Sequence, residues 1–298
     1  MSIKFKHRLE YGVFNFFYQL TKLLPRRGLL KLGRGIGNFA WNKLKFRRQV
    51  IIENLTFAFP DKDEAWILET AHEFYRNLGM TLMEFLAAGH RNSQDLVDNV
   101  VIEGKEHADE LIARGKGAMM ISGHFGNFEL LLPRAATEGM SVYGLAKPQS
   151  NKLIEKFQND IRTREGVEII LTGGSFQRTL KALKSGGFVG LLGDQDAGKK
   201  GQFVDFMGRP ASVSRGPATL AVKSGCPILM AFLYRQPDNS HLLKIEPVIE
   251  IDPSWDEETA IRKLTEIHTA KLEEAIRRAP AMYYWVHRRW KSSPKKTP

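Results

Sequence analysis

From about residue 100 onward, short apolar runs alternate with segments that show helical periodicity, and this constrains the fold more than any other feature. Strands that alternate with helices favour a mainly parallel central sheet with helices over both faces. We therefore predict an α/β fold with strands at 117–122, 141–146, 167–171, 187–193, 228–234 and 242–248. Helices are expected at 151–164, 175–185, 214–224 and 257–278.

The first ninety or so residues are predicted to be helical, with a break near 57–63. Residues 11–24 form an amphipathic helical segment with a wide aromatic face, but they fall short of the ~20 apolar residues that a membrane span needs. Basic residues follow this segment: Arg26, Arg27, Lys31, Arg34, Lys43, Lys45, Arg47 and Arg48. An apolar helix face beside basic sequence is typical of a helix that lies on an anionic membrane surface. The alternative is that the same face packs on its own domain.

These patterns predict two parts, a membrane-associating helical segment at 1–55 and an α/β domain at 56–298. The chain carries 44 basic and 33 acidic residues, a net charge of +11, which predicts anionic partners. No nucleic-acid recognition motif accompanies the charge, so we expect no nucleic acid among them. The single cysteine, Cys226, excludes an intrachain disulfide and is expected to be a small packed residue.

The most informative motif for function begins right after the apolar run 118–122. It places His124 and Glu129 five positions apart. His124 stands between Gly123 and Gly126, and Glu129 follows Gly126 by three positions. On one regular helix these two side chains would point roughly 140° apart. We therefore place His124 in the turn that follows a strand and Glu129 in the first helical turn, with the glycines allowing a sharp corner. Ligands bind at this end of the strands in α/β folds, so a general base with its orienting carboxylate is predicted. A core histidine beside a surface glutamate is the alternative.

Other motifs that suggest chemistry fail on inspection. The segment 193–199 matches the start of a phosphate-binding loop, but Lys200 stands where Ser or Thr must hold magnesium. The glycines at 33–37 have the wrong spacing for a dinucleotide loop. There is no Gly-x-Ser-x-Gly motif, and the histidines lack metal-ligand spacing. We expect no cofactor and no metal.

Four segments carry a combined signal: the H-x-x-x-x-E box from His124 to Glu129, 147–151 with 162–166, 193–196 with 203–211, and 280–291. Together they resemble the lipid A late acyltransferases, the lauroyl and myristoyl transferases within the lysophospholipid acyltransferase superfamily. The box resembles the H-x-x-x-x-E motif of that family, and the other three segments are similar to its second region, its third region and its closing signature.

The resemblance implies a glycerolipid acyltransferase-like fold and transfer of a fatty acyl group from an acyl thioester, on acyl carrier protein, to a hydroxyl of a lipid A precursor. In that scheme His124 is the general base and Glu129 orients it. The resemblance assigns substrate binding to Arg164 and Arg162, to Asp194 and Asp196, and to the loop residues Gly208, Arg209 and Pro210. It also implies a location on the cytoplasmic face of the bacterial inner membrane, either interfacial or single-pass.

Several alternatives stay open at this point. The acceptor can be another lipid, such as a phosphatidylinositol mannoside, a lysolipid or an amino-acid lipid. A non-catalytic peripheral membrane-binding protein with the same fold is the alternative from a different class. Arg164 can be a solvated arginine at a helix end, and the two aspartates can be turn caps.

Overall fold

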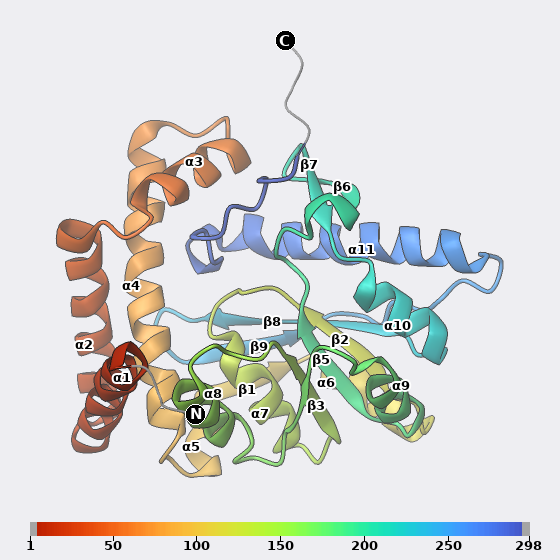
Figure 1. The fold of residues 1–298 in the computed structure, drawn as a ribbon, viewed down its shortest axis with the longest axis horizontal. Coiled ribbons are helices and arrows are strands. Elements are labelled where there is room, and N and C mark those ends of the chain that lie inside the picture. Colours follow the sequence, from red (N-terminus) through yellow and green to blue (C-terminus); the bar gives the residue numbers. More distant parts are fainter. Residues whose placement is uncertain (1–4, 294–298) are drawn as a thin grey trace.

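A seven-stranded sheet forms the centre of the molecule, with the order β1-β9-β8-β2-β5-β3-β4 (Figure 1). The computed structural model describes residues 5–293, so the ends of the two predicted parts, 1–4 and 294–298, lie outside the described residues. All neighbouring strands are parallel except β8 and β9. The strands are β1 Val100–Glu103, β2 Ala118–Ser122, β3 Val142–Ala146, β4 Glu168–Leu171, β5 Phe188–Leu192, β8 Ile228–Arg235 and β9 His241–Ile245.

The predicted α/β class with a mainly parallel sheet is confirmed, and each predicted strand is present within a few residues of its expected bounds. Two features were not predicted. Strand β1 is a four-residue edge strand, and the pair β6 Gln202–Phe206 and β7 Arg209–Val213 forms a separate antiparallel hairpin. Met207 and Gly208 connect that hairpin with positive φ values of 58° and 75°, as a two-residue type I′ turn requires.

Helices cover both faces of the sheet because alternate strand residues point to opposite sides. Ala118 and Met120 of β2 join an apolar cluster with α6 Lys105–Ala113 and α7 Leu131–Ala136. Met119 and Ile121 join the larger cluster on the other face, with α9 Phe176–Lys184, α10 Gly216–Ser224 and α11 Glu257–Arg278. Cys226 is a buried free cysteine in the larger cluster, as expected.

In the described part of the chain, five α-helices precede the first strand, and the first three pack against the longest of them, α4 Glu64–Ala88 (Figure 1). The fifth, α5 Ser93–Asn99, leads into β1. Helix α2 Arg26–Phe39 lies so close to α4 that a Cβ atom at Gly33 would lie 2.6 Å from the carbonyl oxygen of Gly79. The glycines at 33 and 37 therefore serve helix packing. Helix α3 Arg48–Ala58 runs through residues 55 and 56, where we place the boundary between the two predicted parts.

Helix α1 Phe5–Leu23 has one packed face and one exposed face. Phe14, Phe17 and Tyr18 pack into a cluster with α4, and the hydroxyl of Tyr18 donates to the carbonyl oxygen of Gly89 at 3.1 Å. The large apolar residues on the opposite face are exposed: Phe5, Leu9, Val13, Phe16 and Leu23. Within residues 5–293, no helix has the length and apolar character that crossing a membrane requires.

Candidate active site

The loop after β2 is held in one conformation by its backbone. Gly126 has a φ of 57°, and a Cβ atom there would lie 1.7 Å from the carbonyl oxygen of Leu233. Its N–H donates to the carbonyl oxygen of Met282 at 2.8 Å. Glycine is therefore required at 126 by the left-handed conformation and by the close approach of β8.

His124 is paired with Asp194, because two adjacent parallel strands end at the same level. Ser122 of β2 is in register with Leu192 of β5, and His124 and Asp194 each lie two residues farther on. The Nδ1 atom of His124 lies 2.8 Å from Oδ1 of Asp194, and the main-chain N–H of His124 donates to Oδ2 at 3.1 Å. A carboxylate on Nδ1 fixes that nitrogen as the protonated one and leaves Nε2 free to accept a proton.

The same contact changes the pKa of both groups. Burial alone would lower the pKa of His124, but the charge and hydrogen bond of Asp194, with a further contribution from Glu129, outweigh it and raise that pKa above 6.5. Burial alone would raise the pKa of Asp194, but the charge and hydrogen bonds of His124 lower it. Asp194 is therefore a carboxylate near neutral pH.

Glu129 lies in a short 3-10 turn, Phe128–Leu130, that leads into α7, close to its predicted place in the first helical turn. Its carboxylate accepts two hydrogen bonds from Arg162, from Nε at 2.7 Å and from Nη2 at 2.5 Å. Within residues 5–293 no hydrogen bond joins Glu129 to His124. The orienting contact that we expected from Glu129 is therefore made by Asp194, and Glu129 holds Arg162.

The ring of His124 is enclosed by aromatic side chains. It stacks on Tyr284 with a centroid distance of 5.6 Å, and it meets Phe128 in an edge-to-face arrangement with a centroid distance of 4.9 Å. The N–H of Tyr284 also donates to the carbonyl oxygen of His124 at 2.9 Å. The closing segment 280–291 thus packs directly on the loop that carries His124.

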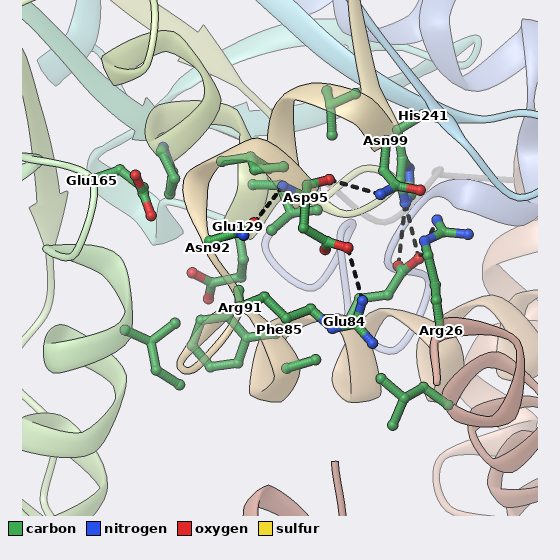
Figure 2. A pocket seen from close by; sticks show the side chains of 18 residues that line it. Arg26, Glu84, Phe85, Arg91, Asn92, Asp95, Asn99, Glu129, Glu165 and His241 are labelled. Carbon is green, nitrogen blue, oxygen red and sulfur yellow. Dashed lines mark hydrogen bonds and ion pairs between the residues drawn. The ribbon is translucent and has the colours of Figure 1, made fainter. Parts of the chain in front are cut away.

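A buried ion cluster holds the other side of this loop. Glu84 of α4 accepts two hydrogen bonds from Arg235 at 2.9 and 2.7 Å. Its carboxylate also lies 3.1 Å from Nε2 of His241 and 3.3 Å from Nη2 of Arg26 (Figure 2). The side-chain amide of Asn127 donates to Glu84 at 3.0 Å, and Asn127 is fully buried. The pKa of Glu84 lies well below its usual value, because the charges and hydrogen bonds of His241 and Arg235 outweigh the effect of burial. The cluster therefore ties the loop to α4 through a buried carboxylate that has four side-chain partners, Arg26, Asn127, Arg235 and His241.

A cavity of about 910 Å³ opens at this edge of the sheet, and His124, Glu129 and Arg162 all line it. Its polar lining also includes Lys147 and Gln149. Most of the remaining lining is apolar and comes from the central sheet and from helices α7, α9 and α10: Met120, Ile121, Leu131, Leu132, Leu145, Val167, Ile169, Phe176, Leu191, Pro217 and Leu220. The cavity joins a base, a cation and a large apolar volume, which suits an amphiphilic substrate.

The structure does not bring all the predicted site residues to this cavity. Arg164 is exposed and donates to the carbonyl oxygens of Gly89, at the end of α4, and of Arg91. Asp196 lines the cavity, but its carboxylate accepts from the N–H of Gly198 and from Ser292 at 2.9 and 2.8 Å, as a turn cap does. Gly208, Arg209 and Pro210 lie in the β6–β7 hairpin outside the cavity lining, where Arg209 lies over the ring of Phe57.

The pairing of Asp194 with His124 is the contact that sequence reasoning missed. A signal was present: both strand runs end in a glycine followed at once by a polar residue, Gly123-His124 and Gly193-Asp194. Recognising this signal requires knowing that β2 and β5 are neighbours in the sheet, and the order of strands cannot be read from the sequence.

Comparison with known proteins gives the family. The model of the bacterial lipid A biosynthesis acyltransferase family matches residues 1–292. The chain belongs to this family. It is therefore an acyltransferase of the lipid A biosynthesis type, as the resemblance of its motifs implies.

Two relatives are similar in sequence over most of their length, and a third over about half of it. A lipid A biosynthesis lauroyltransferase of Escherichia coli (strain K12) is 28% identical over 94% of this chain and 90% of that protein. A lipid A biosynthesis palmitoleoyltransferase of the same organism is 30% identical over 91% and 87%. A phosphatidylinositol mannoside acyltransferase of Mycobacterium tuberculosis (strain CDC 1551 / Oshkosh) is 31% identical, but over only 58% of this chain and 54% of that protein.

Proposed function

We propose that this acyltransferase moves a fatty acyl chain from a thioester on acyl carrier protein to a hydroxyl of a lipid A precursor, with His124 as general base. The observation that carries the proposal is the free Nε2 of His124, whose other nitrogen is held by buried Asp194 at 2.8 Å, on the wall of a large, mostly apolar cavity. The relatives that act on lipid A support the acceptor class.

The reaction needs no covalent enzyme intermediate. Nε2 of His124 takes the proton of the acceptor hydroxyl while its oxygen attacks the thioester carbonyl, and the tetrahedral intermediate then collapses to an ester. The departing thiolate receives the proton back from the imidazolium. Asp194 stabilises the imidazolium and holds its tautomer. Positioned proton transfer of this kind accelerates a reaction by roughly 10²–10⁴-fold.

Arg162 is the residue we assign to an anionic group of the substrate. Its two hydrogen bonds to Glu129 leave three of the five guanidinium N–H donors free and fix the plane of the group at the cavity wall. A phosphate on the acceptor, or the phosphopantetheine arm of the donor, offers the matching oxygens. Glu129 thus has two roles in the proposal: it orients Arg162, and its charge raises the pKa of His124.

Membrane attachment at the cytoplasmic face of the inner membrane is part of the proposal. The exposed apolar face of α1 would lie in the interface, since its opposite face packs on α4. The partial likeness to a phosphatidylinositol mannoside acyltransferase supports a second acceptor class, a different glycolipid with the same kind of hydroxyl.

The test is an assay of purified protein with acyl carrier protein thioester or acyl-coenzyme A, and with a lipid A precursor, a phosphatidylinositol mannoside or a lysolipid as acceptor. Products are identified by mass. His124→Ala should lose at least about two orders of magnitude in kcat, equivalent to about 2.7 kcal/mol, with the protein still folded. A folded variant that keeps more than a tenth of the wild-type rate would remove the base assignment.

The role of Arg162 is tested by comparing it with Arg164, which lies two positions farther along the chain and serves as the matched control. Arg162→Ala should lower kcat/KM strongly for a phosphorylated acceptor. Arg164→Ala should leave kcat/KM near the wild-type value, because Arg164 contacts only carbonyl oxygens near the end of α4. Equal losses in the two variants would argue against Arg162 as the anion-binding residue.

A further inference from the structure

The turn between α2 and α3 exposes large apolar side chains that no part of residues 5–293 covers. Phe39, Leu44 and Phe46 are 55%, 62% and 62% exposed within eight positions of sequence. Trp41, in the same turn, is only 7% exposed and stacks on His72. The turn thus buries one aromatic residue as an anchor and directs three other large residues to the outside.

The backbone of this turn is strained and firmly held. Residues 40–44 form a π-helix, and Lys45 and Arg47 have left-handed φ values of 51° and 53°. Non-glycine residues keep this conformation only where surrounding contacts impose it. Those contacts are present: Tyr75 donates to the carbonyl oxygen of Phe46, and Lys45 N–H donates to that of Ala40 at 2.8 Å. A rigid π-turn that exposes apolar residues is typical of a functional segment.

The charge along this stretch of the sequence is of one sign. The chain has no Asp or Glu between Glu10 and Glu53, while nine Lys and Arg lie in that stretch. Arg27, Lys31 and Arg34 are exposed along α2, and Lys43, Lys45 and Arg47 are exposed in the turn itself. Helices α1 and α2 and this turn lie together along one edge of the molecule (Figure 1). Exposed apolar side chains among these basic residues match an anionic lipid bilayer.

We infer that the turn at 39–46 inserts into an anionic membrane surface as a second attachment point, separate from α1. This inference rests on the proposed interfacial attachment. Its physical consequence is orientation, since one helix lying in an interface leaves the molecule free to rotate about that helix. A second contact at the far end of α2 removes this rotation, and the cavity then faces the bilayer in one fixed way.

The test uses the full chain with vesicles of phosphatidylglycerol and phosphatidylcholine, and with vesicles of phosphatidylcholine alone. Phe39→Ser, Leu44→Ser and Phe46→Ser are combined in one variant. The control variant combines Val101→Ser, Ile112→Ser and Phe203→Ser, three exposed apolar residues away from this edge. The turn variant should bind anionic vesicles about a thousandfold more weakly, at about tenfold per side chain, and the control variant should bind like wild type.

A second measurement reports insertion directly. A cysteine at Phe46→Cys carries a dye whose emission shifts in hydrocarbon, and the native Cys226 is buried and leaves the label selective. The dye should shift on anionic vesicles, and the same dye at Phe203→Cys should not. Bound protein without a shift at 46 would overturn the inference, as would a turn variant that binds like wild type. A shift caused by added carrier protein without vesicles would also overturn it, in favour of a protein-binding surface.

Activity on detergent-dispersed acceptor separates this inference from the proposed function. The turn variant should keep wild-type kcat there, because the turn does not line the cavity. Activity in detergent with no vesicle binding by the wild-type protein would leave acyl transfer standing and reject the attachment.

Discussion

At the scale of single residues, the contact between His124 and Asp194 determines the pH dependence of the reaction. A general base must be neutral to accept a proton, and the pKa of His124 lies above 6.5 because Asp194 and Glu129 outweigh burial. The rate should therefore fall as the pH drops through this raised pKa. The imidazolium–carboxylate pair also stabilises the folded protein, and that contribution is lost as the pH rises through the same value.

Asp194→Asn tests this assignment. Removing the negative charge lowers the pKa of His124, so the acid limb of kcat/KM against pH should move to lower pH. The maximum rate should still fall by about a hundredfold or more, because the correct tautomer is no longer held. Asp196→Asn is the comparison: its carboxylate caps a turn, and its acid limb should stay in place. If the acid limb of kcat/KM does not move in Asp194→Asn, Asp194 does not set the pKa of His124.

Residue-level prediction from sequence succeeded where the information was local. The turn that carries His124 and the start of a helix at Glu129 follow from spacing and from two glycines within seven positions. The partners of these residues were out of reach, because Arg162 is 33 positions from Glu129 and Asp194 is 70 positions from His124. Which of two nearby arginines faces the cavity depends on where α8 Lys152–Arg162 ends and packs.

At the scale of elements, the packing of α7 on the sheet sets one dimension of the cavity. Gly144 of β3 and Gly190 of β5 are paired directly across the sheet. A Cβ atom at Gly190 would lie 2.5 Å from the side chain of Leu132, and one at Gly144 would lie 3.2 Å from it. The glycine pair thus lets Leu132 lie low on the sheet, and all three residues line the cavity.

Leu132→Ala should therefore favour longer acyl chains, because it frees volume beside the two glycines. One methylene in an apolar pocket is worth about tenfold or more in selectivity, so the kcat/KM ratio between neighbouring chain lengths should change by at least about that factor. Leu180→Ala is the control, since Leu180 is also half-buried but lies outside the cavity lining. The measurement is a series of thioesters of increasing length. An unchanged profile, or an equal change in the control, would contradict the assignment.

Elements were predictable where their burial was uniform. Strands β2, β5 and β8 are apolar runs buried on both faces, and each appears within a few residues of its predicted bounds. Strand β1 is four residues long with alternating exposure, too weak a pattern to detect. The β6–β7 hairpin carries charged and polar residues and depends on packing against α11, which sequence periodicity does not report.

At the scale of the whole molecule, the net charge of +11 should influence how the donor is captured. An acidic carrier protein is attracted over distances that salt shortens to ~8 Å near physiological ionic strength. With carrier thioester as donor, kcat/KM should fall steeply as salt rises, mainly through KM. Acyl-coenzyme A, with fewer charges to steer, should be a poorer donor with a shallower salt dependence. Equal use of the two donors, independent of salt, would argue against carrier recognition.

The tight approach of β8 to Gly126 has a consequence for how this chain tolerates change. Every other amino acid at 126 must place a carbon atom against the carbonyl oxygen of Leu233, so a library of single substitutions should contain no active variant at that position. Position 124 should be equally intolerant for a different reason, and a measurement of folding separates the two. His124→Ala should still fold at room temperature although it is inactive, whereas Gly126→Ala should lose its activity together with its fold. Positions 124 and 126 would then tolerate substitution equally poorly for different reasons. His124 accepts the proton in the reaction, whereas Gly126 only allows β8 to approach closely.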